Sequence, residues 1–279
     1  MKEDKWVRLW NMISPPALYM FIQMGVELAV ALITIIYENV KMYKTYGMIN
    51  DAQAVTEKVQ QMMEVNASYI TVASAVMAVI FFGRMYLKER NSFLKENNKE
   101  INTFVMIAFG VMLSMAAGSI LSAMNIDNIY GSYEKTSSLL LNGNIVYRLF
   151  ALGVITPAAE EIIFRGLVFN RVKKQYGSLY GIVVSSVMFG VFHFNLVQGL
   201  YAFIIGMAFA YCYELTGDLK VPVYMHMSIN VLTVLSDYYG LNSITDGNTV
   251  FKVVLTLMEC IISVYLFEMI VKKSWKRGK

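Results

Sequence analysis

Residues 149–169 read LFALGVITPAAEEIIFRGLVF, an apolar stretch that carries Glu160, Glu161 and Arg165 in its second half. A helix of about 20 apolar residues crosses the roughly 30 Å of hydrocarbon in a bilayer. An ionisable side chain at that depth costs about 2.5 to 3.5 kcal/mol or more, and it indicates a functional site by default. The stretch therefore predicts a membrane helix with a site inside it.

The composition of the whole chain agrees with a membrane location. Of the 279 residues, 57% are hydrophobic and only 16% are charged, which excludes an ordinary soluble domain. We predict an all-α integral membrane protein, a bundle of about eight transmembrane helices that forms one membrane domain over residues 1–279. The expected spans are residues 17–39, 68–87, 102–124, 146–169, 178–195, 198–216, 221–240 and 249–271.

Lys and Arg residues predict the orientation of this bundle, because they accumulate in cytoplasmic loops. With the N-terminus inside, the inner segments hold seventeen of them and the outer segments four. Both termini are therefore expected in the cytoplasm. This topology also accounts for the net charge of +4, and no basic cluster is interleaved with aromatic residues, so we expect no nucleic acid partner.

The two adjacent glutamates are expected to have different roles. Neighbouring side chains on a helix project about 100° apart, so Glu160 and Glu161 face different surroundings. Glu161 precedes Arg165 by four residues, the favourable order for a helical ion pair. Glu160 is then left as the free carboxylate, which suits a general base or acid. In the structural alternative, both acids only anchor helices through Arg165 or Arg148.

The first of the two histidines, His193, follows Phe189 by four residues, so both lie on one face of the predicted helix 178–195. A turn at Tyr176 and Gly177 lies sixteen residues from Glu160 on one side and from His193 on the other. In antiparallel helices these two residues reach the same depth. Alone, His193 is as readily explained as a packing residue in an apolar helix.

The second histidine, His226, has the same spacing to Asn230, and together they present two hydrogen-bond donors to one point. Such a pair suits an oxyanion, although it also suits a bond between helices. His226 lies only nine residues past Gly217, so ideal helices would leave it about 10 Å shallower than His193. The helices or turns around these residues are therefore expected to be irregular.

Together, the three motifs resemble a known family of intramembrane proteases. The CPBP family contains CAAX prenyl endopeptidases of the Ras-converting type and bacterial bacteriocin-processing or self-immunity (Abi) proteins. Its pattern of Glu-Glu-x-x-x-Arg, Phe-x-x-x-His and His-x-x-x-Asn is met in order, over a resemblance that covers about residues 146–240. The matching residues are Glu160, Glu161, Arg165, Phe189, His193, His226 and Asn230.

The resemblance implies peptide-bond hydrolysis within the membrane. Glu160 and His193 would activate water, and His226 and Asn230 would stabilise the oxyanion. It also implies a membrane-associated peptide or protein as substrate, and the plasma membrane of a bacterium as the location. The helices within residues 1–145 and the final helix at 249–271 have no assigned role.

The sequence allows alternatives for the role of metal and for the function. Two histidines on different helices do not form the HExxH pattern of zinc proteases, so we favour a reaction without a cofactor. Zinc held by Glu160, His193 and His226 is the alternative. The main competing function is a membrane protein that keeps the pocket to bind a peptide without cutting it, as in sorting or bacteriocin self-immunity. A proton-coupled transporter is less favoured, because no inverted repeat is present.

Overall fold

The computed structural model describes residues 5–46, 52–93, 102–124, 144–241 and 248–275, and these ranges contain helices and turns without a strand. The all-α fold is confirmed. The α-helices are α1 (Lys5–Tyr46), α2 (Ala52–Val65), α3 (Ala67–Glu89), α4 (Thr103–Ala123), α6 (Ile145–Arg148), α7 (Thr156–Glu161), α8 (Asn170–Tyr176), α9 (Ser178–Val191), α10 (Leu196–Thr216), α11 (Lys220–Tyr238) and α12 (Thr249–Trp275). Three further helical segments are η1 (Arg90–Ser92), a 3₁₀ helix, and η2 (Leu149–Ile155) and η3 (Ile162–Phe169), which are π-helices.

Within the described ranges, five helices are long and apolar enough to cross a membrane, so the protein is an integral, multi-pass membrane protein. They are Lys5–Tyr46, Ala67–Ser92, Thr103–Ala123, Leu196–Thr216 and Thr249–Ser274. Three expected spans, 146–169, 178–195 and 221–240, are not among these five. The first contains π-helical turns, and the second corresponds to α9, a shorter apolar helix. The total of eight spans stays a prediction.

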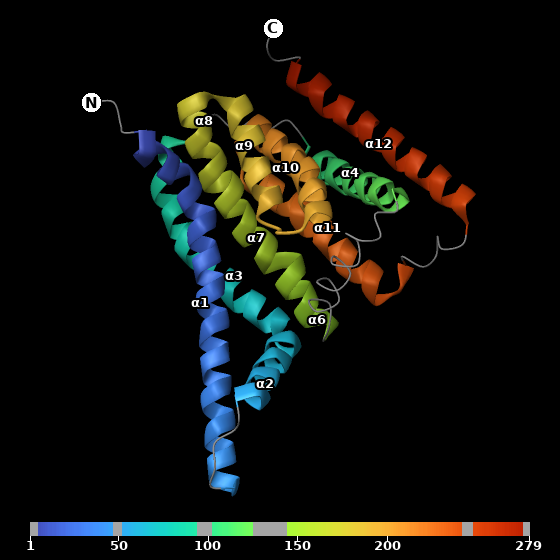
Figure 1. Ribbon diagram of the computed structural model, residues 1–279. Coiled ribbons are helices and arrows are strands. Elements are labelled where there is room, and N and C mark those ends of the chain that lie inside the picture. Colours follow the sequence, from blue (N-terminus) through green and yellow to red (C-terminus); the bar gives the residue numbers. More distant parts are fainter. Residues whose placement is uncertain (1–4, 47–51, 94–101, 125–143, 242–247, 276–279) are drawn as a thin grey trace.

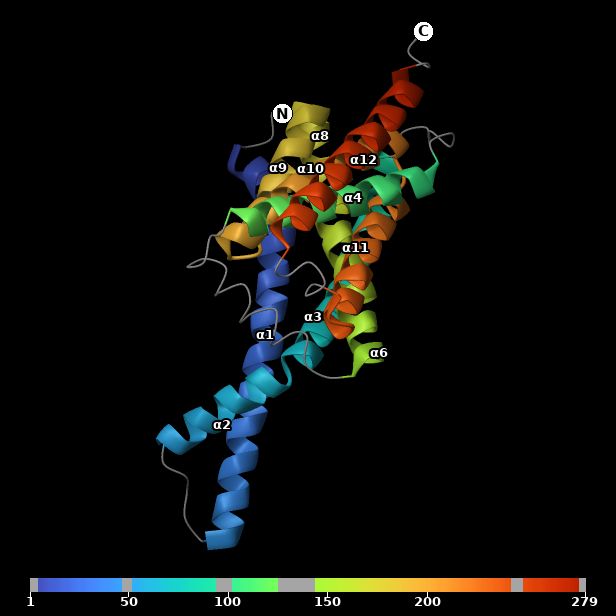
Figure 2. The same cartoon turned by 90° about the vertical axis from the view of Figure 1, so that its right-hand side faces the viewer.

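The helices form three groups around a central rod (Figures 1 and 2). The rod runs from α6 through η2, α7 and η3 to α8, and α9, α10 and α11 pack beside it. On one side α1 and α3 contact the rod. On the other side α4 contacts α10 and α11, and α12 packs on α4. Helix α1 extends well past the bundle, where α2 contacts it (Figure 2).

The rod is helical throughout but not a regular α-helix. Each π-helical turn is wider than an α-turn and changes where the backbone carbonyls point. The side-chain amide of Asn170 donates to the carbonyls of Arg165 and Gly166 at 3.1 and 2.9 Å, so the polar groups of η3 find a partner without water. Irregular backbone is therefore present within the rod, at residues 149–155 and 162–169.

The hairpin of α9 and α10 corrects the prediction for His193. Helix α9 has 14 residues and spans about 21 Å at 1.5 Å per residue, too short to cross the hydrocarbon. It ends at Val191, so His193 lies in the turn before α10 and not within a helix over 178–195. Gly190 and Gly199 allow the tight hairpin, because a Cβ on Gly190 would lie 2.6 Å from the Gly199 carbonyl oxygen.

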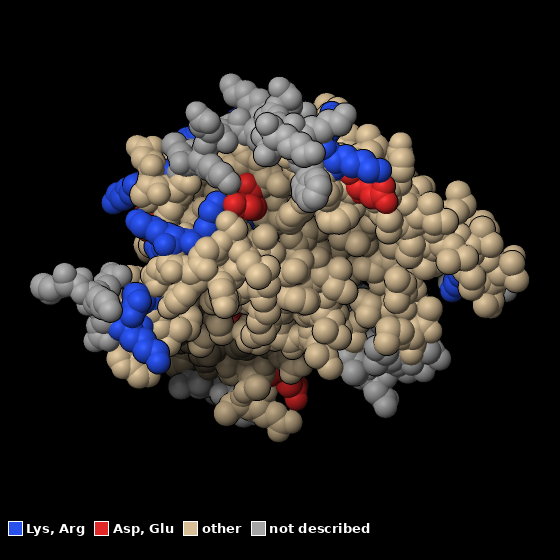
Figure 3. Space-filling view, turned by 90° about the horizontal axis from the view of Figure 1, so that it is seen from above, with Lys and Arg blue, Asp and Glu red and all other residues tan. Residues whose placement is uncertain are grey.

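The start of α1 and the end of α12 lie at the same end of the molecule (Figure 1), as expected if both termini are on one side of the membrane. Seen from that end, Lys and Arg residues form groups around a largely uncharged surface (Figure 3). There Arg171 of α8 binds the Glu89 carboxylate through two nitrogens and the Asn11 carbonyl through a third. These contacts join α1, α3 and α8.

Candidate active site

A buried ion pair lies at the centre of the site. Arg165 Nη1 donates to Glu161 Oε1 at 2.8 Å, and both side chains are fully buried. The ion pair expected from the spacing of Glu161 and Arg165 is present. The guanidinium also lies over the Phe189 and Phe209 rings, 4.6 and 5.4 Å from their centroids. The charge is therefore held between a carboxylate and two aromatic faces.

Gly206 brings α10 into this network. Its carbonyl accepts a hydrogen bond from Arg165 Nη2 at 3.0 Å. A Cβ at this position would lie 3.0 Å from the same nitrogen and 3.2 Å from Phe189 Cδ1, so a larger residue would displace the guanidinium or the ring. The sequence analysis missed Gly206 and Phe209, because neither lies at motif spacing.

Glu161 has a second partner that the spacing of the motifs does not reveal. His226 Nδ1 lies 2.8 Å from Glu161 Oε1, the oxygen that also accepts from Arg165. A carboxylate oxygen can only accept, so Nδ1 carries the proton and Nε2 points away from Glu161. Glu161 therefore orients His226 in addition to neutralising Arg165.

Glu160 occupies different surroundings from Glu161, as the helix geometry predicted. Its side chain is 15% exposed, whereas that of Glu161 is fully buried. Glu160 Oε2 lies 3.8 Å from His226 Nε2, which is too long for a hydrogen bond but close enough for an electrostatic interaction. The two glutamates thus approach the two nitrogens of one imidazole.

His193 is oriented by its own backbone. Its Nδ1 lies 2.8 Å from the Phe189 carbonyl oxygen, which can only accept, so Nδ1 carries a proton. In the neutral ring, Nε2 is then left with its lone pair. The Phe189 ring contacts both imidazoles edge to face, with centroid distances of 5.0 Å to His193 and 5.7 Å to His226. Phe189 therefore separates them from the apolar interior.

No hydrogen bond or ion pair joins Glu160 to His193 in the described part of the chain. The turn between α9 and α10 moves His193 away from the position that two ideal antiparallel helices would give it. Direct contact between the two was not required by the prediction, since one water can link a base to its neighbour.

Asn230 is tied to the first π-helical turn. Its Nδ2 donates to the Leu152 carbonyl oxygen of η2 at 2.9 Å. An amide nitrogen carries two hydrogens, so one donor remains for another acceptor. The contact joins α11 to the rod one helical turn from His226.

Zinc was predicted only as an alternative, with Glu160, His193 and His226 as its ligands. In the ranges that the structure describes, no three His, Cys, Asp or Glu side chains are grouped closely enough to hold a metal ion. His226 has Nδ1 bound to Glu161, so Nε2 is the nitrogen that would bind zinc.

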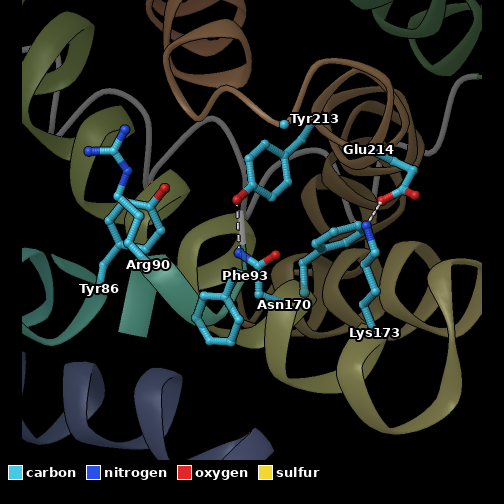
Figure 4. A pocket seen from close by; sticks show the side chains of 9 residues that line it. Tyr86, Arg90, Phe93, Asn170, Lys173, Tyr213 and Glu214 are labelled. Atoms are coloured by element: carbon cyan, nitrogen blue, oxygen red, sulfur yellow. Dashed lines mark hydrogen bonds and ion pairs between the residues drawn. The ribbon is translucent and has the colours of Figure 1, made fainter. Parts of the chain in front are cut away.

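A shallow pocket elsewhere is not part of this site. It lies among Tyr86, Arg90, Asn170, Lys173 and Tyr213, with others, toward the α8 end (Figure 4). Asn170 donates to the Tyr213 hydroxyl at 2.8 Å, and Lys173 forms an ion pair with Glu214 across its wall. None of the predicted site residues lines it.

Comparison with known proteins agrees with the motif geometry. Residues 142–232 match the family model described as type II CAAX prenyl endopeptidase Rce1-like. That segment contains all seven motif residues, from Glu160 to Asn230. Residues 142–232 are therefore similar to this family, in agreement with the resemblance of the three motifs.

A curated relative supports the same assignment. Over 82 residues the chain is 32% identical to "Putative membrane peptidase YdiL" of Bacillus subtilis (strain 168). The match covers 29% of this chain and 34% of the relative, so about two thirds of that protein is not matched. A bacterial relative agrees with the expected plasma-membrane location. No solved structure matches the chain.

We expect Arg165→Ala to destabilise the protein by about 3 to 5 kcal/mol, because it leaves the Glu161 carboxylate buried without its cation. Thermal unfolding in detergent measures this. The matched control is Lys272→Ala, which breaks an ion pair of the same spacing with Glu268 on the exposed face of α12. Its melting temperature should stay that of the wild type. Equal effects of the two substitutions would contradict the central role of the buried pair.

Proposed function

We propose that the protein is an intramembrane endopeptidase that hydrolyses a peptide bond of a membrane-associated peptide or protein. The observation that carries this proposal is the placement of both glutamates around His226. Glu161 holds Nδ1, and the more exposed Glu160 lies 3.8 Å from Nε2. The Rce1-like segment and its peptidase relative support the same reaction class.

Water activation falls to Glu160 and His193. The Glu160 carboxylate accepts a proton from water as the water oxygen attacks the peptide carbonyl carbon. The Nε2 lone pair of His193 accepts the second O–H of that water and so fixes its direction. When the C–N bond breaks, the proton on Glu160 passes to the departing amine nitrogen, which returns the carboxylate to its starting state.

Oxyanion stabilisation falls to His226 and Asn230. Because Nδ1–H of His226 is bound to Glu161, the ring can also donate from Nε2 only as the imidazolium. Two carboxylates, Glu161 at Nδ1 and Glu160 3.8 Å from Nε2, together offset the charges of this imidazolium and of Arg165. Asn230 supplies its second N–H, while its first remains on Leu152.

The substrate is proposed only as a class. A site formed by the rod, α10, α11 and the turn before α10 lies within the membrane bundle, so a peptide must reach it from the membrane or its surface. No residue of the site is specific for a prenyl group. A protein that binds such a peptide without cutting it is the competing function.

Glu160→Gln should lower the cleavage rate at least about 100-fold and leave the protein folded, because the substitution keeps the size and removes the base. Membrane proteomics of cells with either form would identify cleaved proteins, and a synthetic peptide from one of them would give rates in liposomes. The control is Glu259→Gln. Glu259 is another buried carboxylate, which lies in α12 and accepts a hydrogen bond from Ser119 of α4. Rapid cleavage by Glu160→Gln would overturn the mechanism, and peptide binding without cleavage by the wild type would favour the competing function.

Asn230→Ala is expected to lower kcat by about 100- to 1,000-fold with little change in KM, the effect of removing one oxyanion donor. Asn170→Ala provides the control, because that amide also donates to carbonyls of a π-helical turn but lies outside the site. It should lower the melting temperature while kcat of the folded protein is kept. If both substitutions reduced stability and neither changed kcat, Asn230 would be only a structural link.

The metal-free mechanism predicts that turnover survives exhaustive chelation and that the purified protein holds less than one equivalent of zinc. The reason is that Glu160, and not a metal, accepts the proton from water. Metal analysis before and after dialysis against a chelator, followed by rate measurements, tests this. Loss of turnover that returned on adding zinc would establish the metal-dependent alternative.

A further inference from the structure

Tyr19 of α1 is a buried tyrosine whose hydroxyl has no well-aligned hydrogen bond within the described residues. The residue is fully buried, and the hydroxyl oxygen makes no hydrogen bond within the described part of the protein. Most buried polar groups are paired, so an unpaired hydroxyl in the membrane interior requires an explanation. Neither the sequence motifs nor the Rce1-like segment, residues 142–232, includes Tyr19.

The surroundings of the hydroxyl connect it to the active site. It lies within electrostatic reach of the Glu160 carboxylate, and Gln23, one turn along α1, is its other polar neighbour. Neither forms a well-aligned hydrogen bond with it in this arrangement. Glu160 Oε2 lies 3.8 Å from His226 Nε2, too far for a hydrogen bond, so the carboxylate retains capacity to accept.

Aromatic contacts fix the position of the Tyr19 ring. It stacks on Phe192 with centroids 5.4 Å apart and an interplanar angle of 12°, and Phe82 of α3 meets it edge to face. Phe192 directly precedes His193 in the turn after α9. The ring is therefore held between α3 and the turn that carries His193. It also lies in the same buried cluster as Ala159 and Ile163, which flank Glu160 in the rod.

We propose that Tyr19 is a positioning residue that donates its phenolic O–H to the Glu160 carboxylate when the site is in its working arrangement. A carboxylate has two oxygens, and catalysis as a base needs only one of them directed at water. A donor on the other oxygen would fix the rotation of the carboxyl group. Under this proposal α1 is part of the active site, although its sequence lies far from the motifs.

The expected effect of Tyr19 on turnover rests on the proposed function, whereas the expected contact between Tyr19 and Glu160 does not. Tyr19→Phe keeps the ring and its stacking on Phe192 and removes only the hydroxyl, so the melting temperature should change little. With a fluorogenic peptide that carries a membrane-anchoring acyl chain, in liposomes, we expect kcat to fall about tenfold and KM to stay within about twofold. That is the size of effect expected from one hydrogen bond to a charged group.

Tyr213→Phe is the matched control. It removes the hydroxyl of another buried tyrosine, which accepts from Asn170 in the pocket of Figure 4 and has no contact with Glu160. This variant should keep the wild-type kcat. A fall in kcat of equal size in both variants would overturn the assignment, because it would show a general effect of removing a buried hydroxyl.

Infrared spectroscopy tests the contact without any cleavage assay. With ¹³C-labelled glutamate in liposomes, the carboxylate band that disappears in Glu160→Gln belongs to Glu160. We expect that band to shift in Tyr19→Phe and to stay unchanged in Tyr213→Phe, since only the first loses a donor to this carboxylate. An unmoved band in Tyr19→Phe overturns the inference. If the wild type cleaved no peptide, the proposed function would fail, and the infrared result would still decide the role of Tyr19.

Discussion

The arrangement of the site depends on one carboxylate oxygen. Glu161 Oε1 accepts from Arg165 and from His226 Nδ1, and both groups lie 2.8 Å away. A full charge in hydrocarbon is stable only when it is paired and hydrogen-bonded, so these contacts together make a buried arginine possible. The same oxygen then determines which nitrogen of His226 faces Glu160. Stability and chemistry are therefore coupled here, and no side chain of the network can change without affecting both.

The π-helical turns explain why asparagine occurs on both sides of this network. A regular helix over residues 145–176 would use its own carbonyls internally, and an amide near it would need another partner. Instead Asn230 donates to Leu152 in η2, and Asn170 donates to Arg165 and Gly166 in η3. Each irregular turn is thus closed by a side chain, which satisfies polar backbone groups at a depth where water is scarce. The turns also set the direction in which Glu160 and Glu161 project.

The sequence was sufficient to predict the membrane class, the helical fold and the ion pair of Glu161 with Arg165, because each follows from composition or from residues within one helical turn. It was not sufficient to place His193 in a turn, because the end of α9 depends on its packing against α10 through Gly190 and Gly199. The contact of Glu161 with His226 joins residues 65 positions apart, and local spacing does not encode such a contact.

The N-terminal helices illustrate why a partial sequence match describes only part of a site. The matched segment holds the ionisable residues, which recur at fixed short spacings and are therefore recognisable. Tyr19 in α1 and Phe82 in α3 lie in the same buried cluster as Ala159, the residue before Glu160. An aromatic residue in an apolar helix carries no distinguishing pattern. Excluding water around a carboxylate strengthens every electrostatic interaction it makes, so these rings influence the chemistry without being part of a motif. Helices α1 and α3 thus contribute to the buried cluster next to Glu160, although the sequence assigned them no role.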